Sequence, residues 1–201
     1  YVVGAAFTMF FFGRLSDQSG RKPVGVAALA IAVVACGAFL AMSIVTSLAL
    51  LTVARVASGL AVALASGAST AWLIETRRDA ASGTRLAIVA NLVGLGAGPV
   101  VAGLIASLYA PFVVMLALLV VAALASLVAK ETMLEKAPVS LQPRIGVPRE
   151  LRARFVSSSI GGFATFAVLG FYSALAPSVL EHAIEVRSQA IAGAVVGLLF
   201  F

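Results

Sequence analysis

The sequence predicts an all-α membrane protein, and three observations lead to this fold class. The 201-residue chain is 62% hydrophobic and 11% charged, whereas a soluble domain is about 45–50% apolar and about 25% charged. Its apolar residues form long runs, and almost all of its charged residues lie between those runs. A soluble core of this size could not bury so much apolar surface, so lipid must be the solvent for most of the chain.

Five apolar runs are long enough to cross a bilayer as a helix, which takes about 20 mostly apolar residues. They are residues 24–46, 48–73, 86–108, 111–129 and 155–177. The runs do not alternate polar and apolar residues and are about twice the length of a barrel strand, which excludes a transmembrane barrel. Residues 1–12 and 188–201 are apolar but shorter, and we expect them to be parts of two further spans of an internal fragment.

The basic residues occupy alternate connections between the runs. Of the fourteen Lys and Arg residues, three precede the first full run, three lie between the second and third runs, and six lie in residues 130–154. The positive-inside rule predicts that these three connections are cytoplasmic. This placement accounts for the net charge of +6 without a nucleic-acid partner.

The last of these connections is the longest and carries three prolines. Such a polar, proline-containing stretch is typical of a linker between domains. We therefore predict that residues 1–130 are part of an N-terminal helix bundle, that residues 131–153 are a cytoplasmic linker, and that residues 154–201 begin a C-terminal bundle.

The stretch GRLSDQSGRK, from Gly13 to Lys22, resembles the pattern G-x-L-x-D-x-x-G-R-K of the major facilitator superfamily. In that family the pattern lies between the second and third helices and acts as a latch that stabilises one conformation. The matching latch residues are Gly13, Asp17, Gly20, Arg21 and Lys22. Asp17 is expected to accept hydrogen bonds from Arg21 or a helix N-terminus, with Arg21 and Lys22 at the phospholipid surface. Gln18 stands where the family commonly has a base, and the alternative interpretation is an ordinary basic turn.

Arg55 is the only charged residue inside a complete run. A guanidinium in a bilayer costs at least about 2.5–3.5 kcal/mol and usually faces the bundle interior. Arg55 and Gly59 resemble the R-x-x-x-G pattern of the family's fourth helix, where the Arg is tied to proton transfer. The alternative is that Arg55 snorkels to the outer interface.

The stretch NLVGLGAGPVVAGLI resembles the fifth-helix pattern G-x-x-x-G-P-x-x-G-G of the antiporter branch, with Ala102 in place of one glycine. Its matching residues are Gly94, Gly98, Pro99 and Gly103. Proline bends a helix and small residues let another helix approach, so the resemblance implies a bend that favours exchange. The alternative is generic small-residue packing.

The resemblance covers essentially the whole chain and implies a fragment that runs from the second to the eighth helix of a major facilitator fold. It implies a monomeric transporter in the bacterial inner (plasma) membrane that moves small amphipathic compounds outward by alternating access, coupled to protons, without a cofactor. Phe163, Phe166 and Tyr172 could line its substrate cavity or face lipid. The rivals are an importer or facilitator of the same fold and a non-transporting membrane sensor or scaffold.

An enzyme or a metal site is not predicted, because the chain has one histidine, His182, and one cysteine, Cys36. These residues do not supply a Ser-His-Asp set or paired metal ligands. Cys36 lies among Val, Ala and Gly and is interpreted as a small packing residue.

Overall fold

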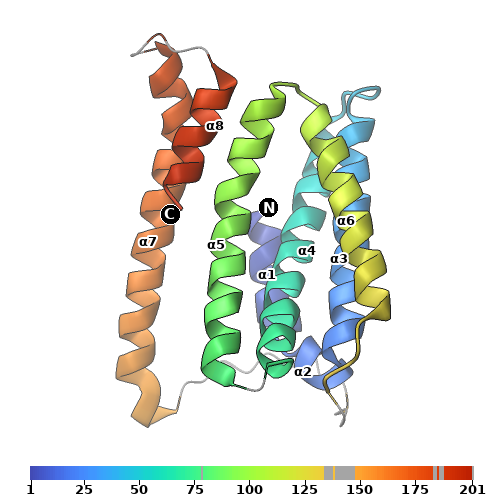
Figure 1. The fold of residues 1–201 in the computed structure, drawn as a ribbon, viewed down its shortest axis with the longest axis vertical. Coiled ribbons are helices and arrows are strands. Elements are labelled where there is room, and N and C mark those ends of the chain that lie inside the picture. The colour runs from blue at the N-terminus through green and yellow to red at the C-terminus, as the bar shows by residue number, and fades with distance from the viewer. Residues whose placement is uncertain (78, 134–137, 139–147, 183–184, 186–187, 201) are drawn as a thin grey trace. The chain divides into compact units, whose positions relative to one another are not determined.

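The computed structural model describes residues 1–201 except 78, 134–137, 139–147, 183–184, 186–187 and 201, and the described part is helical without strands (Figure 1). The α-helices are α1 (Val2–Phe12), α2 (Leu15–Ser19), α3 (Arg21–Ala41), α4 (Leu48–Glu75), α5 (Ala80–Ile105), α6 (Ala110–Val128), α7 (Arg152–His182) and α8 (Gln189–Leu198), and a 3-10 turn, η1, covers Arg149–Leu151. The predicted all-α membrane fold is therefore confirmed.

The five predicted spans correspond to α3, α4, α5, α6 and α7, each long and apolar enough to cross a membrane. Their ends differ from the prediction by several residues. The largest differences are that α5 begins at Ala80 instead of residue 86, that α3 ends at Ala41, because a turn follows it, and that α7 continues through Pro177 to His182. The two short apolar ends form α1 and α8.

Contacts divide the chain into two compact units. The first holds residues 1–88 and 109–143, and the second holds residues 89–108 and 144–201. Most of the predicted linker, residues 131–153, lies outside the described residues, and the predicted division into two bundles stays a prediction.

The first unit is organised around α3 and α4, which pack against each other, with α6 beside α3 and α1 beside α4. Its buried residues are mostly small. On α4 the buried alanines Ala54, Ala61 and Ala68 recur every seven residues, and on α3 Ala28 and Ala35 do the same. A seven-residue spacing keeps small side chains on one seam between two helices, and small residues let helix backbones approach in lipid.

Large apolar side chains lie outside this seam and are widely exposed, for example Val34 and Val53. This distribution suits a lipid solvent, because lipid tails are as apolar as the protein core and association depends on close backbone packing. Cys36 is buried and packs in the same region, as expected for a small packing residue.

Two glycines allow α1 to cross α4 closely. A Cβ added at Gly4 would overlap the carbonyl oxygen of Val56, and one added at Gly59 would overlap the carbonyl oxygen of Tyr1. The helix backbones are therefore in direct contact, and Gly59 has a packing function whatever other function it serves.

The second unit contains the later part of α5 together with α7 and α8. A Cβ at Gly103 would lie 3.0 Å from the Cα atom of Gly193, and a Cβ at Gly193 would lie 3.0 Å from the Cα atom of Gly103. A Cβ at Gly197 would also lie 2.7 Å from the carbonyl oxygen of Gly96. The backbones of α5 and α8 are thus held together by glycines.

The crossing of α1 and α4 predicts different effects for two glycines on α4. Gly59→Ala should destabilise the full-length protein by about 1–3 kcal/mol, because the added methyl must push α1 away. Gly67→Ala is the matched control, since a Cβ at Gly67 would meet none of the described residues within 4 Å and alanine favours the helix by about 1 kcal/mol. Thermal unfolding in detergent measures both, and equal effects would contradict the crossing.

Candidate functional site

The predicted latch residues lie at the junction of α1, α2 and α3. Gly13 follows the end of α1, Asp17 lies in α2, and Gly20 separates α2 from α3. Gly20 has a φ of 111°, a backbone conformation that only glycine adopts readily. A Cβ at this position would also lie 2.5 Å from Oε2 of Glu131. Both features require glycine at this turn and place the start of α3 against Glu131.

Arg21 is the centre of an ion-pair network. Its guanidinium donates hydrogen bonds to the carboxylates of Asp17 and Glu75, with 2.8 Å between Nη2 and Oε1 of Glu75. It also donates to Oγ of Ser16 over 3.1 Å. Only 13% of the Arg21 side chain is exposed. Two carboxylates hold the side chain inside the cluster, and the expected position of Arg21 and Lys22 at the phospholipid surface stays a prediction.

Glu131, which follows α6, caps the N-terminus of α3. Its Oε1 accepts a hydrogen bond from the backbone N–H of Arg21, and its Oε2 accepts one from Lys22, both over 3.0 Å. The N–H groups of Thr132 and Met133 also donate to Oε1. Such groups at a helix start otherwise lack partners, and the helix dipole favours a negative charge there.

The hydrogen bonds decide the charge state of Glu131. Burial alone would raise the pKa of its carboxyl group, but donation from the four backbone N–H groups outweighs burial and holds the pKa below its ordinary value. The carboxyl group is therefore ionised at neutral pH, which is the form that accepts these bonds best.

These contacts join the ends of three helices. The hydroxyl of Thr132 donates to Glu75 at the end of α4. The ammonium group of Lys22, at the start of α3, donates over 2.6 Å to the carbonyl oxygen of Leu127 near the end of α6. We call Asp17, Arg21, Glu75, Glu131 and Thr132 the Arg21 cluster. Its bonds can form only while the ends of α3, α4 and α6 lie together.

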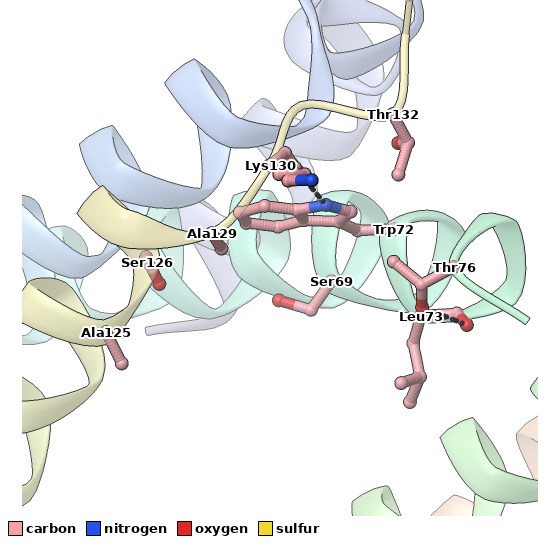
Figure 2. Close-up of a pocket in the computed structure, with 9 residues that line it drawn as sticks. All are labelled: Ser69, Trp72, Leu73, Thr76, Ala125, Ser126, Ala129, Lys130 and Thr132. Carbon is pink, nitrogen blue, oxygen red and sulfur yellow. Dashed lines mark hydrogen bonds between the residues drawn. The ribbon is translucent and has the colours of Figure 1, made fainter.

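A pocket of about 460 Å³ adjoins the Arg21 cluster between α4 and the end of α6 (Figure 2). The indole of Trp72 lies along it and donates a hydrogen bond to the carbonyl oxygen of Lys130 over 2.9 Å. The hydroxyls of Thr76 and Ser126 donate to backbone carbonyls of their own helices. The pocket therefore offers a mainly apolar surface, with Thr132 shared between its lining and the cluster.

Arg55 lies on α4 away from the Arg21 cluster. Its guanidinium carbon is 5.6 Å from the centroid of the Phe39 ring, and Phe39 stacks on Phe112 with 5.3 Å between ring centroids. A cation over an aromatic face gains electrostatic stabilisation. The side chain is exposed, and among the described residues its guanidinium has no carboxylate within 4.0 Å.

The structure separates the glycines of the predicted antiporter pattern. Pro99 lies inside α5, and Gly103 lies at the crossing with α8. In contrast, a Cβ at Gly94 or Gly98 would meet nothing within 4 Å in the described part of the chain. The aromatic residues Phe163, Phe166 and Tyr172 are exposed on α7, and their assignment to a substrate cavity stays a prediction.

Sequence reasoning did not assign Glu75 or Glu131 to the site. Glu75 is the last residue of α4 and Glu131 follows α6, so 54 and 110 residues separate them from Arg21. The available signal was that each is an acidic residue at the end of an apolar run with basic connections. That signal does not show which ends meet.

The geometry predicts energetic coupling between Arg21 and Glu75. Arg21→Ala and Glu75→Gln should each lower the free energy of unfolding of the full-length protein. The loss in the double variant should be smaller than the sum of the two single losses by about 1 kcal/mol or more, because either change breaks the same ion pair. Chemical or thermal unfolding of the four proteins measures this. Arg21→Ala combined with Asp79→Asn is the control and should be additive, since Asp79 caps the start of α5. Additivity of both pairs would contradict the network.

The lowered pKa of Glu131 predicts a pH-dependent contribution to stability. Because the folded-state pKa lies below the ordinary value of 4.5, the contribution is complete above that value and is lost as pH falls through the folded-state pKa. At pH 7, Glu131→Gln should lower stability by about 1 kcal/mol, as for loss of a helix cap. The difference between wild type and variant should shrink as pH falls below 4.5. Unfolding of both proteins from pH 7 to pH 3 measures this difference in stability. A difference that stays constant with pH would argue against an ionised cap.

Comparison with known proteins gives one match, to a protein family. The sequence model of the Major Facilitator Superfamily matches residues 1–201. No curated protein and no solved structure matches the chain. The family match spans every residue and agrees with the membrane-spanning helices, and we conclude that the protein is an integral membrane protein of the major facilitator superfamily, a family of secondary transporters of small molecules.

Proposed function

We propose that the protein is a proton-coupled efflux transporter of small amphipathic compounds that works by alternating access. The observation that carries the coupling is Arg55, a cation within a membrane-spanning helix that contacts an aromatic ring and, in the described part of the chain, no carboxylate. A charge in this position is costly and is typically retained for ion movement. Its field would stabilise the deprotonated form of a nearby acidic group and release a proton when the two approach.

The Arg21 cluster supports the alternating-access part of the proposal. Its ion pairs and helix cap join α3, α4 and the chain after α6, so they stabilise one arrangement of these helix ends. A second arrangement must break several of these bonds together, which makes the cluster a latch between two states rather than a hinge that deforms gradually. The positive-inside rule puts this latch on the cytoplasmic side.

The later part of α5 supports exchange. Pro99 removes one backbone donor from the helix, and Gly103 brings α5 against α8. A helix in direct backbone contact with its neighbour transmits movement to it without side chains in between. In our proposal this contact closes the pathway between outward and inward states, so that substrate and proton do not leak.

Proton flux in proteoliposomes of the full-length protein tests the coupling. Addition of a transported lipophilic cation or neutral amphiphile should drive proton movement in the direction opposite to the compound. Arg55→Ala should reduce the coupled proton flux at least about 10-fold. This is the loss expected when a positioned charge that lowers the activation free energy by about 1.4 kcal/mol is removed. Arg55→Lys should retain part of it, and Arg85→Ala, which removes an exposed cation near the start of α5, should have no effect.

The same assay separates the alternatives. Compound movement without proton movement in wild type would favour a facilitator, and movement of proton and compound in the same direction would favour an importer. Absence of both would favour a membrane sensor or scaffold. Normal coupled transport by Arg55→Ala would remove Arg55 from the mechanism while leaving the family assignment intact.

A further inference from the structure

The second unit contains a cavity of about 350 Å³ between α5, α7 and α8. Its lining residues are Pro99, Ala102, Gly103, Ser173, Pro177, Gln189, Ala192, Gly193 and Val196. None of these residues is charged. The glycine contact between α5 and α8 forms one side of the cavity, because Gly103 and Gly193 take part in both.

Ser173 gives this cavity an unsatisfied polar group. Its Oγ atom is buried and has no hydrogen-bond partner in the described part of the chain. Serine on a helix usually bonds to a carbonyl oxygen of the preceding turn, as Thr165 does on the same helix. A buried hydroxyl without a partner costs free energy of folding, so this group calls for a partner that the described part of the chain does not provide.

Pro177 adds an acceptor at the same place. In an α-helix the N–H of residue 177 would donate to the carbonyl oxygen of Ser173, but proline has no N–H. Ser173 therefore offers both a hydroxyl donor and a carbonyl acceptor that lacks its usual helical partner. Gln189 at the start of α8 also lines the cavity.

We propose that this cavity is a substrate subsite that binds the uncharged hydrogen-bonding group of an amphipathic compound, such as a carbonyl, hydroxyl or amide. The inference rests on the proposed transport function and gives the substrate class for this part of the pathway. Neutral donors and acceptors suit such a group, whereas a lining without charged side chains leaves an ammonium or carboxylate without a counter-ion. The apolar remainder of the lining takes the body of the compound.

A matched pair of probes tests the subsite. 2-Acetylnaphthalene carries a carbonyl acceptor, and 2-ethylnaphthalene has the same carbon skeleton without a hydrogen-bonding atom. Equilibrium binding of each probe is measured with the full-length protein in nanodiscs, with empty nanodiscs subtracted for partitioning into lipid. Wild type should bind the ketone about 3- to 10-fold more tightly than the hydrocarbon, the range expected for one neutral hydrogen bond.

Variants then locate the preference. Ser173→Ala should weaken binding of the ketone to the level of the hydrocarbon and leave the hydrocarbon unchanged. Ser158→Ala removes an exposed serine from the same helix and should keep the preference. Pro177→Ala restores the helical N–H donor to the Ser173 carbonyl. This variant should weaken the binding of 2-naphthylmethanol, which donates a hydrogen bond, more than the binding of the ketone.

The result that overturns the subsite is a preference that survives Ser173→Ala, or equal binding of the two probes by wild type, as expected if only water fills the cavity. Binding is measured without a gradient, so its failure is distinct from failure of the proposed function. A protein that exchanges protons for compounds but binds the probes equally would contradict the subsite alone. A protein that discriminates between the probes without moving protons would contradict the coupling alone.

Discussion

Lipid provides no hydrogen-bond partner, and every other feature of this structure follows from that constraint. A chain in hydrocarbon must satisfy its backbone polar groups internally, and helices do so within a single segment. The described part is accordingly a set of helices whose charged residues, apart from Arg55, lie near the helix ends or between helices. Without a strong hydrophobic drive between helices, the contacts depend on close backbone packing, which the buried alanines of α3 and α4 and the glycine crossings provide.

The same constraint explains why polar groups without a partner in the membrane-spanning helices point to function. Arg55 lies inside a span without a carboxylate among the described residues, and the hydroxyl of Ser173 is buried without a partner in that same part of the chain. Each imposes a cost that an apolar or small residue would avoid. Substrate movement gives a reason for such groups to be present, and the Arg21 cluster shows the contrasting case, in which charges are satisfied by one another.

The sequence was sufficient to predict the helices and their membrane character, because length and hydropathy determine both. Gly20 and Arg21 were also identified, since a fixed pattern of glycine, acid and base points to one turn. Asp17 was predicted as a partner of Arg21, and its carboxylate accepts a hydrogen bond from the guanidinium. The contacts of Arg21 with Glu75 and Glu131 were not predicted, because these two residues come from helix ends far along the chain. Which ends meet depends on helix packing, and packing through small residues leaves only a weak pattern in one sequence.

The position of Trp72 has a practical consequence. It is the only tryptophan in the chain, and its indole N–H bonds to the carbonyl of Lys130, the residue before the Glu131 cap. Indole emission depends on polarity and hydrogen bonding around the ring, so separation of α4 from the end of α6 would change its wavelength and intensity. The intrinsic fluorescence of Trp72 therefore reports on the helix contact beside the Arg21 cluster, without an attached dye.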